Sequence, residues 1–128
     1  MANVIFLTLE QILAIHFDQI ERYSGSHGVR DLPLLESAMQ RPQASFYGED
    51  LYVGIFDKAA ALMHSLILNH PFIDGNKRTG TVATAGFLHF NGHDLKLTQK
   101  ELVEISLLVE SKKLDLEQIS KWLKDHSI

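Results

Sequence analysis

The chain has 128 residues, of which 45% are hydrophobic, and it carries a formal net charge of −4 with no cysteine. These values predict a single globular domain over residues 1–128 and exclude a disordered chain, a disulfide scaffold and a thiolate zinc site, while the acidic balance argues against bulk nucleic-acid binding. No basic leader precedes the N-terminal apolar run, and the apolar stretch 59–68 is too short to span a bilayer, so we expect a soluble cytoplasmic protein with no direct nucleic-acid or membrane partner.

Two helices are expected in the first third of the chain. Thr8 and Gln11 form a capping-box pattern, and apolar residues recur at helical spacing from there to about Tyr23. Asp31 is a typical N-cap residue for a second, shorter helix, which Pro42 is expected to end. A polar, glycine-containing loop connects the two helices.

The middle of the chain contains the two most apolar expected helices. Residues 43–50 have no clear period and predict a surface loop, after which Asp50 is expected to cap a helix over residues 51–69. A further helix over residues 76–91 is apolar nearly all round, which is typical of the buried centre of a domain. Residues 93–97 are expected to be extended.

Two more helices are expected near the C-terminal end. Thr98 with Glu101 and Asp115 with Gln118 repeat the capping pattern, and apolar residues follow each pair at helical spacing. The pattern therefore predicts an all-α domain, a compact bundle of about six helices around a buried central helix, with almost no strand.

The loop between the two central helices, residues 70–80, gathers most of the reactive side chains. Pro71 ends the first helix, and Gly75 permits the backbone turn into the second. A connection of about five residues predicts an αα-hairpin, which places His70 beside the N-terminus of the next helix. Free N–H groups and the positive end of the helix dipole make such a terminus an anion site, and we expect the N–H groups of Gly75, Asn76 and Lys77 to surround a phosphate.

The side chains of this loop suit phosphoryl or nucleotidyl transfer. Arg78 can bind phosphate oxygens as a fork, and Lys77 adds a point charge. Asp74 offers the hard oxygen ligand that magnesium prefers, and His70 suits a general base that takes a proton from a hydroxyl. The same residues are equally compatible with a turn, a helix stop and solvated charges that have no catalytic role.

The segment from His70 to Arg78 resembles the signature of the Fic/Doc (Fido) superfamily, His-Pro-Phe-x-Asp/Glu-Gly-Asn-Gly-Arg followed by two residues and a final Arg. Seven fixed positions match at the same spacing. The resemblance implies a Fido-type helical fold and ATP with Mg²⁺ as cofactors. It implies the following roles: His70 as general base, Asp74 as the metal- or phosphate-organising acid, Gly75-Asn76-Lys77 as the anion hole, and Arg78 as a phosphate ligand.

Two departures from the signature bear on the reaction. Lys77 replaces the glycine expected after Asn76, and Thr81 replaces the final arginine. The resulting form resembles the death-on-curing (Doc) toxin branch, which implies a type II toxin–antitoxin system. In that branch the terminal phosphate of ATP goes to a hydroxyl of elongation factor Tu, with Lys77 as part of the catalytic set, and translation stops. A cognate antitoxin is the implied partner. The alternatives are Fic-type transfer of AMP to a protein hydroxyl and a catalytically silent binding module.

Other polar residues are weaker candidates. His89 and His93 have the spacing of a metal pair, but a helix end is expected between them and no third ligand is evident. His16 lies on a mainly apolar helix, as does His64, and both are expected to be buried and hydrogen-bonded. Arg30 and Arg41 are expected either to reach the nucleotide or antitoxin or to be solvated loop cations.

Overall fold

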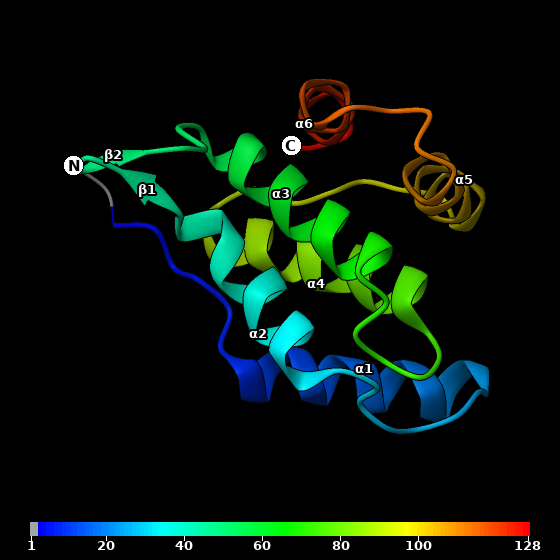
Figure 1. Ribbon diagram of the computed structural model, residues 1–128. Helices are drawn as coiled ribbons and strands as arrows, with labels where there is room; N and C mark the ends of the chain where they lie inside the picture. The colour runs from blue at the N-terminus through cyan, green and yellow to red at the C-terminus, as the bar shows by residue number, and fades with distance from the viewer. Residues whose placement is uncertain (1–2) are drawn as a thin grey trace.

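The computed structural model describes residues 3–128 and confirms an all-α fold (Figure 1). Over these residues the chain forms six α-helices, one short 3₁₀ helix and a two-stranded antiparallel hairpin. The elements are α1 (Leu9–Tyr23), α2 (Leu32–Gln40), the 3₁₀ helix η1 (Arg41–Gln43), β1 (Ser45–Phe46), β2 (Glu49–Asp50), α3 (Ile55–Leu68), α4 (Asn76–Phe90), α5 (Gln99–Glu110) and α6 (Leu116–Asp125).

The capping patterns mark four of the helix starts correctly. Each of these caps accepts a hydrogen bond from a backbone N–H of the first turn, which would otherwise have no partner. The caps are Thr8 for α1, Asp31 for α2, Thr98 for α5 and Asp115 for α6. The expected extended piece after α4 is confirmed as well, since Leu95 forms an antiparallel bridge with Ser127.

The predicted start of α3 was wrong by four residues. The helix begins at Ile55 and is capped by Gly54, whose N–H donates to the carboxylate of Asp57 (3.2 Å). Asp50 instead accepts a hydrogen bond from Nζ of the buried Lys58 at 3.1 Å. That ammonium also donates to backbone carbonyls of the segment 51–54, so the segment folds over a buried charge and cannot continue the helix.

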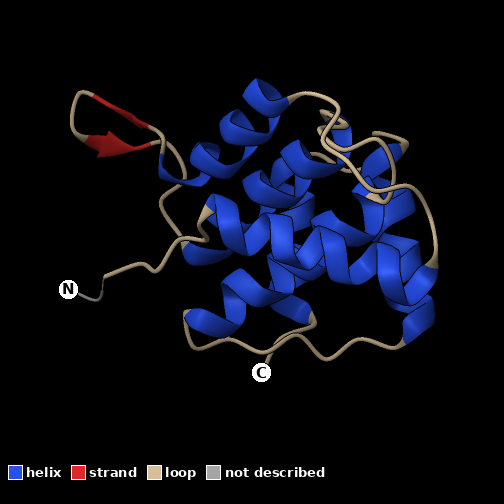
Figure 2. Ribbon diagram, turned by 90° about the horizontal axis from the view of Figure 1, so that it is seen from below, coloured by secondary structure: helices blue, strands red, loops and turns tan. Residues whose placement is uncertain are grey.

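The loop predicted at residues 43–50 is in fact the end of η1 followed by a hairpin. Ser45 pairs with Asp50, and Phe46 pairs with Glu49. Tyr47 and Gly48 form the turn with φ of 51° and 78°, values that match the right-handed twist of a two-residue hairpin. A tyrosine in the left-handed region is uncommon, so no turn signal marked this hairpin in the sequence. The hairpin projects from one end of the bundle (Figure 2).

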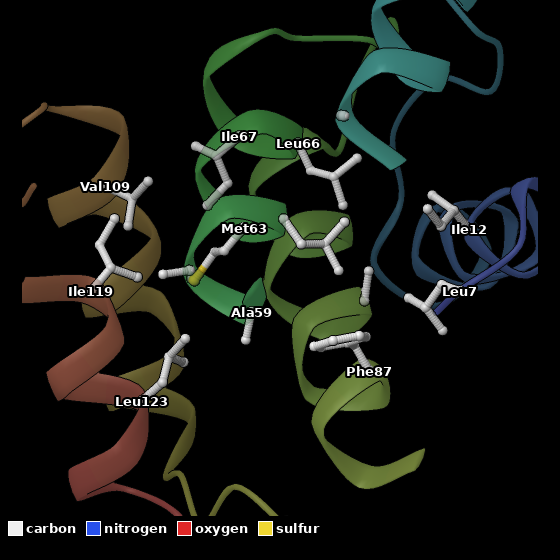
Figure 3. Close-up of a cluster of buried hydrophobic side chains, with 14 of the residues drawn as sticks. Leu7, Ile12, Ala59, Met63, Leu66, Ile67, Phe87, Val109, Ile119 and Leu123 are labelled. Atoms are coloured by element: carbon white, nitrogen blue, oxygen red, sulfur yellow. The ribbon is translucent and has the colours of Figure 1, made fainter. Parts of the chain in front are cut away.

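The centre of the fold is the pair α3 and α4 rather than α4 alone. Helix α3 packs against α2, α4, α5 and α6, while α1 covers the other side of α4. Figure 3 shows Met63 and Ala59 of α3 between Ile119 and Leu123 on one side and Phe87 of α4 on the other. The end of α4 is less buried than its composition suggested, because Phe90 is 45% exposed.

A glycine sets how closely the two central helices approach. A Cβ atom at Gly80 of α4 would lie 2.8 Å from Cγ1 of Ile67 in α3, so any larger residue would force the helices apart. This close pairing confirms the expected αα-hairpin and fixes the position of the loop that joins the helices. No helix within residues 3–128 is long and apolar enough to cross a lipid bilayer.

The α1–α2 loop lies beside the α3–α4 loop, at the end of the bundle opposite the hairpin (Figure 1). Val29 and Phe72 form an antiparallel bridge, and the N–H groups of Arg30 and Asp31 both donate to the carbonyl of Pro71 (2.8 and 3.0 Å). These backbone contacts hold two loops from distant parts of the sequence as one surface, and the reactive residues lie on it.

Candidate active site

The α3–α4 loop and the first turn of α4 line a pocket of about 370 Å³. All six residues expected to form the site lie on its wall, together with two residues that the sequence did not indicate. The lining residues are His70, Ile73, Asp74, Gly75, Asn76, Lys77, Arg78 and Glu110. The pocket therefore brings together an imidazole, two carboxylates, two cations and a helix N-terminus.

His70 is exposed at the edge of this pocket on an unusual backbone conformation. Its φ is 47°, in the left-handed region that few non-glycine residues adopt. Arg30 supports this conformation, because its Nε donates to the carbonyl of His70 (2.7 Å) and its Nη2 to the carbonyl of Asn69 (2.9 Å). Arg30 thus caps the C-terminal end of α3 and is neither a free loop cation nor a residue of the pocket wall.

The amide of Asn76 fixes the loop from inside. Its Oδ1 accepts the N–H of Phe72 (2.9 Å), and its Nδ2 donates to the carbonyl of Phe72 (3.0 Å). Phe72 itself is 1% exposed, and its ring stacks on that of His16 with centroids 3.8 Å apart. The side chain of Asn76 is therefore occupied by the loop, while its backbone N–H has no hydrogen-bond partner within residues 3–128.

Asp74 is held as a carboxylate by backbone donors. Its oxygens accept the N–H groups of Ser26 (3.1 Å) and Gly75 (2.8 Å), and these bonds lower the pKa of the Asp74 carboxyl. Its carbonyl accepts a hydrogen bond from Nε2 of His16 at 2.8 Å. Burial is the largest cause of the lowered pKa of His16, so this residue is a neutral, hydrogen-bonded support of the loop, as expected.

The first turn of α4 presents free donors to the pocket. Within residues 3–128, the N–H groups of Asn76, Lys77 and Arg78 have no hydrogen-bond partner. The N–H of Gly75 is already bonded to Asp74, so the set of free donors is shifted by one residue from the expected one. Gly75 is the N-cap with φ of 75°, and a Cβ there would lie 2.9 Å from Ile20.

The two cations of the pocket differ in their partners. Lys77 Nζ lies 3.2 and 3.1 Å from the two carboxylate oxygens of Glu110, at the end of α5. Arg78 donates from Nη2 to the carbonyl of Ser24 (3.0 Å), and its guanidinium lies 5.3 Å from the ring centre of Tyr23. Nε of Arg78 is buried without a partner within residues 3–128.

Thr81, which stands where the signature has its final arginine, lies away from the pocket. Its side chain is 2% exposed, and its hydroxyl donates to the carbonyl of Lys77 within the same helix (2.9 Å). The position therefore supplies no charge to the pocket.

Sequence reasoning missed Glu110 and Ile73, and it did not foresee that Arg30 caps α3. Glu110 is 33 residues from Lys77 and ends a different helix, so no local pattern connects the two. Ile73 is the variable position of the signature, and it is 58% exposed beside the polar wall. An isoleucine in an otherwise polar loop was the sequence signal that could have identified it.

The remaining candidates are directed elsewhere. Nδ1 of His89 lies 2.6 Å from Asp94, whereas His93 packs on the ring of Phe56, so the two histidines have separate partners. Arg41 is engaged inside the fold, donating to His64 Nδ1 (2.9 Å) and to the hydroxyls of Ser65 and Tyr52. Burial, with the charge of Arg41, lowers the pKa of His64. Arg41 is therefore part of the fold and does not line the pocket.

Comparison with known proteins is consistent with this geometry. Residues 6–88 match the sequence model of the Fic/DOC family. A protein named Toxin Doc from Mycolicibacterium smegmatis is 52% identical over 73 residues, a stretch that covers 57% of this chain and 56% of that protein. A protein named Protein kinase doc from Escherichia phage P1 is 26% identical over 115 residues, which is 90% of each chain.

Proposed function

The chain belongs to the Fic/DOC family, and we propose that it is a toxin that transfers the terminal phosphate of ATP to a hydroxyl of a target protein. One observation carries the proposal. An exposed imidazole, His70, and the open N-terminus of α4 face the same pocket. A base and an anion site on one wall are what phosphoryl transfer needs, because its catalysis consists mainly of positioning and charge stabilisation.

The transfer is written with each group in one role. His70 accepts the proton of the target hydroxyl, whose oxygen forms a bond to the terminal phosphorus. The bond from that phosphorus to the oxygen bridging it to the next phosphate breaks, and ADP leaves with the electron pair. The free N–H groups of the first turn of α4, with Lys77 and Arg78, hold the phosphate oxygens while charge moves onto the leaving group.

Asp74 fits the role of magnesium ligand. Its carboxylate is bound by backbone N–H groups and, within residues 3–128, by no cationic side chain, and its lowered pKa keeps it ionised at neutral pH. Magnesium is usually held by one or two carboxylates together with phosphate oxygens and water, so a single carboxylate beside a phosphate site is sufficient. When bound, the ion would offset the charge of the phosphates.

Transfer of phosphate is favoured over transfer of AMP by three findings. The relative aligned over 90% of the chain is named a protein kinase. Lys77 adds a cation where the family signature has glycine, and the position of the final arginine is occupied by the buried Thr81. AMP transfer remains the alternative reaction on the same scaffold, and a silent binding module is the alternative of a different class.

Labelled ATP separates these functions. The purified protein is incubated with elongation factor Tu, the target implied by the family resemblance, and with ATP labelled at the alpha or the gamma phosphate. Gamma label alone on the target is expected. Alpha label on the target means AMP transfer, and absence of both labels from every protein of a bacterial lysate would support the silent module.

The partner and the physiological setting are part of the same proposal. One relative is named Toxin Doc, and we propose that this chain likewise acts in the cytoplasm as the toxin of a type II system, blocks translation, and is held inactive by an antitoxin protein. Growth should stop on expression of the wild type and continue with His70→Ala. Co-expression of the neighbouring reading frame should restore growth, and equal toxicity of both variants would argue against catalysis.

We further propose that the domain includes the part of the chain beyond the family match. Helices α5 and α6 both pack against α3, and Glu110 of α5 lines the pocket. A chain truncated after α4 is therefore expected to lose its cooperative unfolding transition. A truncated chain that still unfolds cooperatively would show that residues 89–128 are a separate unit.

A further inference from the structure

The pocket has no net charge, although it is proposed to bind a polyphosphate. Lys77 and Arg78 supply two positive charges, and Asp74 and Glu110 supply two negative ones. Asp74 belongs to the signature and is oriented by the loop backbone. Glu110 lies outside the signature, ends α5, and lines the pocket with the carboxylate that pairs with Lys77. The neutrality therefore depends on a residue that the shared motif does not include.

The pair formed by Lys77 and Glu110 is close but easily separated. Both carboxylate oxygens of Glu110 lie within 3.2 Å of Nζ, yet the side chains are 41% and 34% exposed. Ion pairs with this much access to water contribute little stability, because water solvates the separated charges almost as well. A phosphate can therefore replace Glu110 as the partner of Lys77, but the unpaired carboxylate then stays beside the bound anion.

We propose that Glu110 is a specificity-determining residue that restricts the pocket to metal-complexed nucleotide, by occupying Lys77 in the empty pocket and repelling uncomplexed polyphosphate. The inference rests on the proposed function and deepens it. The magnesium complex of ATP carries fewer negative charges than free ATP, and repulsion from a fixed carboxylate grows with the charge of the ligand. Glu110 thus penalises free ATP more than the complex and makes binding depend on magnesium.

The test is the ratio of two dissociation constants, measured by calorimetry on the full chain. One is for a non-hydrolysable ATP analogue with excess chelator, the other for the same analogue with excess Mg²⁺. Glu110→Gln keeps the size and polarity of the side chain and removes its charge. Glu104→Gln, on the exposed face of the same helix, is the matched control for the loss of one acidic charge.

The expected result is selective. Glu110→Gln should tighten binding of the free analogue by on the order of tenfold at low salt and that of the magnesium complex by less, so the ratio falls. Glu104→Gln should leave the ratio unchanged. The difference between variants should shrink as salt is added, since the effect acts through partly exposed charges. Circular dichroism should show both variants folded.

Two outcomes would overturn the inference while the proposed function stands. An unchanged ratio in Glu110→Gln would mean that the carboxylate does not act on the ligand. Weaker binding of the magnesium complex alone would make Glu110 a metal ligand instead. The same titrations with inorganic pyrophosphate keep the two proposals apart. Loss of ATP binding with retained pyrophosphate binding counts against the nucleotide function only, and failure of both ligands to bind the wild type rejects both proposals.

Discussion

Replacement of Asn76 by alanine should destabilise the protein strongly, although Asn76 belongs to the site signature. Its amide is the partner of both the N–H and the carbonyl of Phe72 (2.9 and 3.0 Å), in a region where Phe72 is 1% exposed and Asn76 is 9% exposed. A buried backbone group without a partner costs about 1–3 kcal/mol, so two of them predict a loss of about 2–6 kcal/mol. The unfolding free energy of a domain of this size is only about 5–15 kcal/mol.

The measurement is urea unfolding followed by far-ultraviolet circular dichroism. The midpoint should fall for Asn76→Ala with little change in the slope of free energy against urea. Asn69→Ala is the matched control, because Asn69 lies at the other end of the same loop and its side chain makes no hydrogen bond within residues 3–128. A loss below about 0.5 kcal/mol in Asn76→Ala would refute the reasoning, since exposed substitutions produce changes of that size.

Three further predictions concern the backbone and the charge of the loop. Gly75→Ala should lower the unfolding midpoint, since φ is 75° and the new Cβ would meet a side chain of α1 at 2.9 Å; an unchanged midpoint would show that the loop relaxes freely. Arg30→Ala should release the carbonyl of His70, so phosphate transfer should slow markedly while the unfolding midpoint falls little. Unaltered transfer rates would show that Arg30 does not position His70. The pKa of Asp74 is lowered, chiefly by the hydrogen bond from the N–H of Ser26. The carboxylate therefore stabilises the fold fully above the ordinary carboxyl pKa of 3.8, and this contribution is lost as the pH falls through the lower pKa of the folded state. Urea midpoints from pH 7 to pH 2 should thus fall less in Asp74→Asn than in the wild type, and parallel curves would contradict this.

The helix ends show what local chemistry can predict. Thr8, Asp31, Thr98 and Asp115 cap helices as expected, because an N-cap acts only on the turn that follows it. The start of α3 could not be predicted in this way. Asp50 has a carboxylate that could cap a helix, but this carboxylate accepts a hydrogen bond from the buried ammonium of Lys58. That contact follows from the burial of Lys58 and not from a local capping pattern.

The same distinction between local sequence and tertiary contacts applies to the site. From His70 to Arg78 the sequence alone determined which groups meet, because nine consecutive residues that stop one helix and start the next must lie around a single helix N-terminus. Only the tertiary structure decided what surrounds them. Electrostatic and hydrogen-bond partners depend on distance in space. The contacts of Glu110 with Lys77, of Ser26 with Asp74 and of Arg30 with His70 therefore form only when α5 and the α1–α2 loop pack against α3 and α4. The motif thus set the chemistry available to the pocket, and the packing of distant segments set its net charge.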